Sequence, residues 1–344
     1  MTFTNVMKPG ESQQIGKDRI LVTGGSGFIG THLVNHLISI GYEVFNLDLL
    51  PPKEVGKAQW YGGSILDKKR IMSVLGEVQP KMVIHLAAYA SMDAKSLNDF
   101  IANTEGTRIL LEALKTCQSI ERVIVTSSQH VRRPGTPPPT SDTDYVPHEF
   151  YGESKVITEN NTREAGLECC WTIIRPTTVW GPFQPPLADG VWRVLKRGLY
   201  LHPKNDPVLR SYGYVKNVVW QIERLLCAPV EKVNHRVFYV GDKNIRQFEW
   251  VNAFARALTG KNVKTVPLWI IKSLAFVGDV LRNVGVGFPM YGSRLYNLIS
   301  PNSVPIEPTL ILLGPPPYSM EEGIRETMVW LDEYYKSQAN KSVS

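Results

Sequence analysis

Short apolar runs alternate with segments of helical periodicity through the first half of the chain. A helix is predicted after residue 28, because Ile29, Leu33, Leu37 and Ile40 recur every three or four positions before Gly41. A second helix is predicted over 98–116. Buried parallel strands are predicted where the apolar runs stand, at residues 19–23, 43–47, 82–86, 122–126 and 171–174. Strands and helices that alternate in this way indicate βαβ units, so the fold class is α/β.

The second half of the chain has a different pattern. Prolines cluster near residues 182–186 and 315–317, strand signals become rare, and helical periodicity dominates. Helices are predicted around 214–227, 247–258 and 267–283. This pattern favours a smaller, mostly helical C-terminal lobe beside the sheet.

Composition and charge narrow the classes of protein. The 344 residues are 43% hydrophobic and 20% charged, which excludes a disordered or fibrous chain. Net charge is +6, with 38 Lys and Arg interleaved among 32 Asp and Glu, so no nucleic-acid partner is expected. The four cysteines form no CxxC pair and no zinc spacing, which predicts free thiols, no metal site and a cytoplasmic location.

One apolar segment raises the question of membrane contact. Residues 268–281 are interrupted by Lys272, Gly278 and Asp279 and fall short of the roughly 20 apolar residues that a span requires. Residues 1–16 lack the apolar core of a signal peptide. We therefore expect no stable membrane insertion, and a buried core helix over 268–281 is favoured over a helix lying on a membrane surface.

A glycine-rich turn, TGGSGFIG, joins the first strand to the first helix at residues 23–30. Gly24, Gly27 and Gly30 would allow a tight turn, a close approach of backbone N–H groups to a pyrophosphate, and close helix packing. Asp48 ends the next strand, where a carboxylate can accept from a ribose hydroxyl and repel a 2′-phosphate. The pattern predicts NAD rather than NADP. The alternative interpretations are a glycine turn without a ligand and a solvated Asp at the end of a strand.

Tyr151 and Lys155 stand four residues apart, on one face of a predicted helix. A nearby ammonium group favours the phenolate and lowers a tyrosine pKa from its usual value near ~10, which suits proton exchange with a carbinol oxygen. Ser128 follows the strand at 122–126, at the sheet edge where ligands bind. The alternatives are a surface Tyr–Lys pair and a serine that caps a turn.

Together these elements resemble the extended short-chain dehydrogenase/reductase family, of the NAD-dependent epimerase/dehydratase type, over about residues 18–335. Similar segments include HLAA at 85–88, RPTTVWGP at 175–182 and RSYGYV at 210–215. The resemblance implies a Rossmann-type doubly wound parallel sheet and a homodimer joined through the helices at 98–116 and 151–166. It also implies an NAD-binding domain over 17–181 with a returning strand near 236–241, a substrate-binding lobe over 182–335, and tails at 1–16 and 336–344.

The resemblance assigns a role to each site residue. The expected catalytic residues are Ser128, Tyr151 and Lys155. The residues expected to bind cofactor are Gly24, Gly27, Phe28, Ile29, Gly30, Asp48, Ser64, Ile65, Leu86, Ala87, Asn103, Tyr151 and Lys155. The residues expected to bind substrate are Ser128, Thr178, Arg210 and Arg294, the two arginines as donors to a diphosphate. For Arg294 the alternative is a surface or structural arginine.

Several positions depart from the family pattern. Thr178 and Asn217 stand where an Asn and an Asp are usual, and Ser64 replaces the first Asp of the adenine-contacting segment. Gln129 and His130 stand where dehydratases carry an acid pair, which argues against water elimination. His130 is either an acid/base residue or a structural one.

Three functions are weighed. The first is an NAD-dependent nucleotide-sugar epimerase, in which a hydride is removed and returned through a keto intermediate. The second is a dehydrogenase or reductase of a small alcohol, ketone or sterol-like substrate, suggested by Thr178, Asn217 and the apolar segment 268–281. The third is a non-catalytic NAD-binding regulatory protein.

Overall fold

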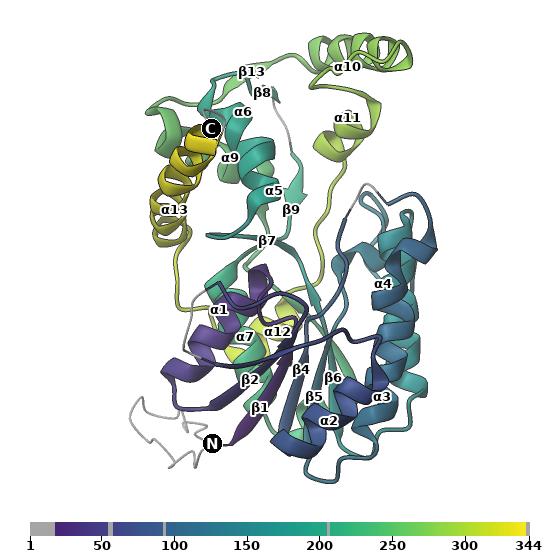
Figure 1. Ribbon diagram of the computed structural model, residues 1–344. Coiled ribbons are helices and arrows are strands. Elements are labelled where there is room, and N and C mark those ends of the chain that lie inside the picture. Colours follow the sequence, from purple (N-terminus) through teal and green to yellow (C-terminus); the bar gives the residue numbers. More distant parts are fainter. Residues whose placement is uncertain (1–17, 54–57, 92–93, 205–206, 342–344) are drawn as a thin grey trace, which may run out of the picture.

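The computed structural model describes residues 18–341 apart from 54–57, 92–93 and 205–206. The predicted tail at 1–16 lies outside the described residues. A seven-stranded sheet of order β11-β6-β5-β4-β1-β2-β3 forms the centre, and every neighbouring pair in it is parallel (Figure 1). Its strands are β1 (Arg19–Thr23), β2 (Glu43–Asp48), β3 (Gln59–Gly62), β4 (Met82–His85), β5 (Arg122–Thr126), β6 (Cys170–Pro176) and β11 (Arg236–Val240). The predicted Rossmann-type sheet is confirmed.

The edge strand β3 was not predicted from the sequence. In its QWYG segment Tyr61 is buried, whereas Gln59, Trp60 and Gly62 are exposed, so it lacks the apolar run that marks the inner strands. The inner strands are buried on both faces because helices cover both sides of the sheet. Predicted and observed bounds differ by one residue at β4, and by more at β6, where the strand continues to Pro176.

Helices pack on both faces of the sheet (Figure 1). The layer on one face consists of α1 (Phe28–Ser39), α7 (Val215–Cys227) and α12 (Glu307–Leu313). The layer on the other face consists of α2 (Lys68–Val78), α3 (Thr107–Leu114) and α4 (Phe150–Glu164). In each layer the buried side chains recur at helical spacing, as Leu33 and Leu37 do on α1.

The predicted continuous helix over 98–116 is wrong. The segment consists of a 3-10 turn (Leu97–Phe100), a π turn (Ala102–Gly106) and then α3. The carbonyl oxygen of Asn103 accepts from the Thr107 hydroxyl at 2.7 Å and from the Thr158 hydroxyl of α4 at 2.8 Å. These side chains satisfy a backbone group that the π turn removes from the regular α-helical pattern. The interruption points Asn103 at the loop after β4.

The C-terminal lobe is mainly helical, as expected. Its helices are α5 (Pro185–Leu187), the π turn at Ala188–Trp192, α6 (Arg193–Lys196), α9 (Gln247–Thr259), α10 (Leu268–Asn283), α11 (Gly292–Ile299) and α13 (Met320–Lys341), while α8 (Val230–Val233) precedes β11. Short pairings add β7 (Thr178–Trp180) with β10 (Tyr212–Tyr214), β9 (Leu209–Arg210) with β12 (Ile245–Arg246), and β8 (Leu201–Pro203) with β13 (Lys264–Val266). Because α13 runs to Lys341, residues 336–341 are helical rather than part of a tail.

The expectation of a buried core helix over 268–281 is also wrong. α10 buries Ile271, Ala275 and Gly278, whereas Trp269 and Phe276 are 67% and 70% exposed. The helix lies at the end of the lobe, next to α11 and far from the sheet (Figure 1). It therefore has neighbours along one side and a large apolar surface along the other.

Candidate active site

The glycine-rich turn has the geometry of a phosphate cradle. Gly24 has a φ of +76°, and a Cβ atom there would lie 2.5 Å from the backbone nitrogen of Ala87. A Cβ at Gly30 would lie 2.1 Å from the carbonyl oxygen of Gly24. α1 begins at Phe28 with Gly27 as its N-cap and without a side-chain cap, so its first amides stay available to an anion. The turn fits the pyrophosphate of a dinucleotide.

Asp48 is fixed against this turn. One carboxylate oxygen accepts from the backbone N–H of Ser26 at 2.9 Å, and the other accepts from the N–H of Leu50 at 3.0 Å. The side chain is therefore oriented by backbone donors at the carboxyl end of β2 rather than loosely solvated. This placement agrees with the expected contact to a ribose.

The strand order reverses between β1 and β4, and ligands bind at such a point in open sheets. Leu86 and Ala87 follow β4 here, with the Leu86 N–H donating to Thr23 O at 2.9 Å. Beneath them His85 is enclosed by the hydroxyls of Thr23 and Thr107, at 2.7 and 3.1 Å from its ring nitrogens. Burial lowers the pKa of His85 to about 3. This neutral histidine supports the site from below.

Asn103 connects the loop after β4 to α4. Its amide accepts from Tyr89 N at 2.7 Å, donates to Tyr89 O at 2.9 Å, and donates to the Ser154 hydroxyl at 3.0 Å. Asn103 therefore positions the backbone near the site through protein contacts. The predicted cofactor residues Ser64 and Ile65 follow β3, and Ile65 packs against Gly106 at the end of the same π turn.

The predicted catalytic residues meet beyond the carboxyl end of β5. Tyr151 and Lys155 lie on α4, with the Lys155 ammonium 6.0 Å from the centre of the Tyr151 ring. Ser128 caps the short helix after β5, and its side chain lies close enough to Tyr151 to lower the pKa of the phenol. The Lys155 ammonium donates to Thr126 O at 2.9 Å. Three elements therefore bring together a phenol, a hydroxyl and an ammonium group.

The pKa of Tyr151 is shifted in the opposite direction to the one predicted from the sequence. Burial raises the pKa of Tyr151, and its hydrogen bond with Ser128 offsets part of that rise. The Lys155 ammonium, 6.0 Å from the ring centre and bound to Thr126 O, does not reverse this rise. Burial lowers the pKa of Lys155 to about 8, against the attraction of Glu159. The protein by itself therefore keeps Tyr151 protonated.

A buried ion pair one turn beyond Lys155 was missed. Glu159 is fully buried and accepts from Arg175 Nε at 2.7 Å, from Arg163 at 3.0 Å and from the Ser127 hydroxyl at 2.6 Å. Burial favours a higher pKa for Glu159, but these partners lower it overall. The pair fixes α4 to β5 and β6, which carry the site. An acidic residue at helical spacing from Lys155 was the available signal.

His130 belongs to a second polar cluster beside the tyrosine. Its ring lies edge-on to the Tyr151 ring, with the centres 5.6 Å apart, and its Nδ1 lies 3.4 Å from a Glu149 oxygen. The other Glu149 oxygen lies 3.2 Å from His148 Nε2. Although burial favours a higher pKa for Glu149, the two histidines lower it overall. The sequence did not indicate that Glu149 and His148 accompany His130.

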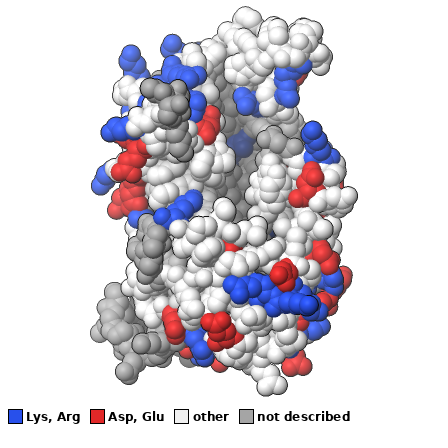
Figure 2. All heavy atoms as spheres, in the orientation of Figure 1, with Lys and Arg blue, Asp and Glu red and all other residues white. Residues whose placement is uncertain are grey.

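The predicted substrate residues have different surroundings. Thr178 accepts from the Gln129 amide at 3.0 Å, which joins β7 to the catalytic loop, the segment after β5 that carries Ser128 and Gln129. Arg210, on β9, donates to Gln247 at 2.5 Å and to Ser300 O at 3.3 Å. Arg294 is exposed on α11 and contacts its own segment, through Pro289 O at 2.6 Å and the Tyr291 ring. Figure 2 shows this face of the molecule hollowed between the two lobes.

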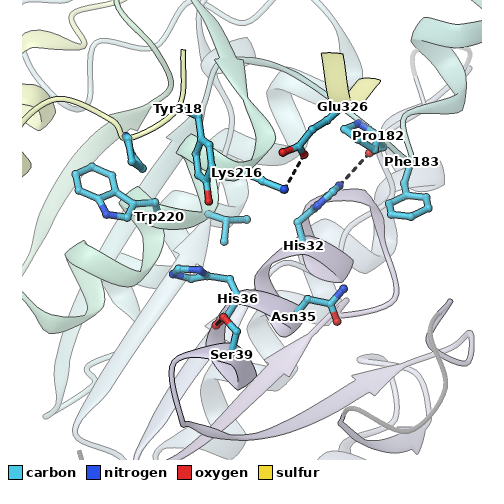
Figure 3. Close-up of a pocket in the computed structure, with 12 residues that line it drawn as sticks. His32, Asn35, His36, Ser39, Pro182, Phe183, Lys216, Trp220, Tyr318 and Glu326 are labelled. Atoms are coloured by element: carbon cyan, nitrogen blue, oxygen red, sulfur yellow. Dashed lines mark hydrogen bonds and ion pairs between the residues drawn. The ribbon is translucent and has the colours of Figure 1, made fainter. Parts of the chain in front are cut away.

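A separate cavity of about 450 Å³ lies on the outer side of α1, between α7 and the start of α13 (Figure 3). His32 closes one wall by contacting Pro182 O at 3.0 Å, and Lys216 pairs with Glu326 at 2.6 Å. These contacts tie α1 and α7 to the C-terminal lobe. Tyr151 and Lys155 do not line this cavity, which is therefore distinct from the catalytic group.

Comparisons with known proteins agree with this geometry. A sterol-4-alpha-carboxylate 3-dehydrogenase (decarboxylating) of Schizosaccharomyces pombe is 27% identical over 90% of this chain and 96% of its own length. A UDP-N-acetyl-alpha-D-glucosaminuronate decarboxylase of Bacillus cytotoxicus is 28% identical over 73% of this chain and 83% of its own. The UDP-glucose 4-epimerase of Thermotoga maritima, solved with UDP-glucose, superposes with a TM-score of 0.70 at 24% identity, over 92% of this chain and 99% of its own.

The family comparison covers the whole sheet domain. The model of the NAD dependent epimerase/dehydratase family matches residues 20–241, from β1 to the end of β11. The match includes the glycine-rich turn, Ser128, Tyr151 and Lys155. The chain therefore belongs to the NAD dependent epimerase/dehydratase family and is an enzyme of the oxidoreductase or isomerase type with NAD as its cofactor.

Proposed function

We propose that this enzyme epimerises a nucleotide sugar through a keto intermediate. The observation that carries the proposal is that Ser128, Tyr151 and Lys155 meet beyond the carboxyl end of β5, in a chain that also carries the phosphate cradle. When bound, NAD supplies the acceptor and donor of the hydride. The chain supplies the proton chemistry at the substrate oxygen.

Tyr151 exchanges that proton at its phenolic oxygen. Because the protein keeps the phenol protonated, the tyrosine is poised to donate to a carbonyl, and it needs added positive charge to accept from an alcohol. Ser128 orients the substrate oxygen through its hydroxyl. Lys155, from 6.0 Å, adds positive charge near the tyrosine ring. His130, held by Glu149, is a further candidate acid or base.

Two observations support a nucleotide sugar as the substrate class. The relative from Bacillus cytotoxicus acts, by its name, on a UDP-sugar and shares most of this chain. Arg210 lies in the C-terminal lobe, where Gln247 and Ser300 orient its guanidinium as a phosphate donor. Thr178 joins the same lobe to the catalytic loop.

A second candidate is net dehydrogenation of a sterol-like alcohol. It is supported by the relative from Schizosaccharomyces pombe, which the chain matches over nearly its full length and which is named a sterol dehydrogenase. Neither candidate involves water elimination, because Gln129 and His130 stand where dehydratases carry an acid pair.

The balance of NADH separates the candidates. Purified enzyme is incubated with UDP- or GDP-sugars, and with a sterol 3-alcohol, while absorbance at the NADH band and sugar composition are followed. Interconversion of sugars without net NADH supports the epimerase. Stoichiometric NADH from the sterol with inert sugars overturns it in favour of the dehydrogenase. A Tyr151→Phe variant, which keeps the ring and removes the phenolic oxygen, should lose either activity.

The homodimer remains a proposal. It would join the segments around α3 and α4, and sedimentation equilibrium of the purified chain tests it.

A further inference from the structure

The outer face of α10 is mainly apolar, with Ser273 as a polar residue within it, whose hydroxyl donates to Trp269 O at 3.0 Å. Trp269, Phe276, Val280 and Val284 recur at helical spacing on one stripe, and Val280 and Val284 are 49% and 70% exposed. The opposite stripe, formed by Ile271, Ala275 and Gly278, is buried against the lobe. A helix at the surface of a soluble domain normally turns polar residues outward. An exposed apolar stripe on this scale marks a docking surface.

Packing fixes the direction in which this stripe points. At Gly278 a Cβ atom would lie 1.7 Å from Met290 O, so the loop before α11 touches the α10 backbone. The Asp279 carboxylate accepts from the N–H of Gly292 at 3.0 Å, at the start of α11. α10 cannot rotate to bury Trp269 and Phe276 without breaking these contacts. The apolar stripe is therefore held outward.

The surroundings of the stripe are basic. Residues 260–306 contain five basic residues and one acidic residue. The acidic one, Asp279, is engaged by the start of α11. The basic residues are all exposed, and they are Lys261, Lys264, Lys272, Arg282 and Arg294. Lys272 has the helical spacing that puts it beside the stripe, whereas Arg282 and Arg294 lie over the Tyr291 ring, on the side of α10 that faces α11. Figure 2 shows an uncharged upper edge with Lys and Arg atoms below it. The basic rim of the stripe therefore consists of Lys272 and the exposed basic residues of the adjoining segments, and its net positive charge complements an anionic surface.

We propose that α10 is a peripheral membrane helix, which lies flat on an anionic phospholipid surface and inserts Trp269, Phe276, Val280 and Val284 among the headgroups. An amphipathic helix with aromatic residues on its apolar side and basic residues beside it binds in this way. None of the described helices is long and apolar enough to cross a membrane, which agrees with a helix that rests on the surface. A second copy of this chain would bring two basic rims together, so charge disfavours it as the occupant.

Sedimentation with vesicles tests this proposal on the full-length enzyme. The protein should pellet with phosphatidylcholine vesicles that contain phosphatidylserine, and less with phosphatidylcholine alone or at high salt. The variant Trp269→Glu/Phe276→Glu should lower the partition coefficient by about tenfold or more. The matched control is Ile311→Glu/Val329→Glu, which changes apolar residues that are 84% and 63% exposed on α12 and α13. The control should bind vesicles like the unchanged enzyme.

A second measurement locates the helix directly. Brominated lipids should quench part of the tryptophan fluorescence, and Trp269→Phe should abolish that part while vesicle binding persists. NAD binding and circular dichroism confirm that each variant is folded. Equal pelleting of the α10 variant and its control would overturn the proposal. Vesicle binding that does not depend on phosphatidylserine would also overturn it. A third contrary result would be an enzyme that binds no vesicles but forms a dimer in solution, with the dimer lost in the α10 variant and kept in the control. The proposal is independent of the substrate class.

Discussion

At the scale of single residues, the site depends on groups whose charge is set by burial. His85, Tyr151 and Lys155 all have pKa values moved toward the neutral form by burial. The catalytic pair is therefore less charged in the protein alone than free side chains would be. Added positive charge beside the ring, such as bound NAD would bring, would favour the phenolate of Tyr151, and proton transfer would then depend on cofactor binding.

Lys155→Met should lower turnover and NAD affinity together. The substitution keeps the length of the side chain and removes the ammonium that lies near Tyr151 and binds Thr126 O. We expect a loss of turnover of about 100-fold or more, since a proton-transfer partner contributes on that scale. Steady-state kinetics and calorimetric NAD titration measure both effects. Normal turnover with unchanged NAD affinity would contradict the role proposed for Lys155.

His85 should make the protein sensitive to acid. Its pKa is about 3 in the folded state, below the ordinary value of 6.5, so the unfolded chain binds the proton more tightly. Stability contributed by neutral His85 is complete above pH 6.5 and is lost as the pH falls toward 3. The loss is on the order of 3–5 kcal/mol. Thermal melting from pH 7 to pH 4 should show a steeper fall in Tm than a His85→Gln variant does.

At the scale of elements, two features place α4 and α1 at the sheet edge. The Glu159–Arg175 pair ties α4 to β6, with Nε and Oε1 2.7 Å apart and both side chains almost fully buried. The glycines of the turn allow α1 to begin within contact distance of β1 and β4. Each feature is a steric or electrostatic requirement that a conservative substitution can test.

Glu159→Gln should destabilise the fold. It leaves Arg175 as a buried charge with its carboxylate partner removed, which costs about 3–5 kcal/mol. Urea unfolding followed by circular dichroism gives the free energy of unfolding. Glu121→Gln is the matched control, because its 3.7 Å contact with Lys81 is exposed and worth at most about 1 kcal/mol. Equal losses in the two variants would refute the argument from burial.

Gly30→Ala should abolish NAD binding, because the added methyl would lie 2.1 Å from Gly24 O and push the cradle open. Gly76→Ala is the control. Gly76 lies within α2 with open space around its Cβ direction, so alanine there should stabilise by about 0.5–1 kcal/mol. Fluorescence titration with NADH and thermal melting distinguish the two variants.

At the scale of the whole molecule, one hydrophobic core runs through both lobes. The cluster that contains Ile20 and Val22 of β1 continues through Trp180 into Trp250 and Phe254 of the C-terminal lobe. The Trp250 and Tyr212 rings stack with their centres 4.6 Å apart. Because this cluster is continuous from one lobe to the other, the lobes should not unfold independently.

A single unfolding transition is therefore expected. Tryptophan fluorescence, to which residues of both lobes contribute (Trp60 and Trp171 in the sheet, Trp250 in the C-terminal lobe), and far-ultraviolet circular dichroism should give the same midpoint in urea. Phe254→Ala should destabilise the protein by about 3–5 kcal/mol and shift both signals together. Two separate midpoints would show that the lobes fold as independent units.

The sequence alone determined the parts of this protein that depend on neighbouring residues. The alternation of apolar runs with helical periodicity predicted the parallel sheet, and the glycine turn, Asp48, Tyr151 and Lys155 are the residues predicted to form the cofactor and catalytic region. Their spacing carries the information, because a turn, a strand end and one helix face are local structures. Tertiary contacts decided the remaining features.

These features depend on residues far apart along the chain. The apolar pattern of 268–281 indicated burial, and the structure leaves Trp269 and Phe276 exposed because the lobe covers a single side of α10. The helix over 98–116 is interrupted because Thr158, from another helix, satisfies the Asn103 carbonyl. Periodicity shows which side chains favour burial. The packing of distant segments decides which neighbour covers those side chains and which pKa values result.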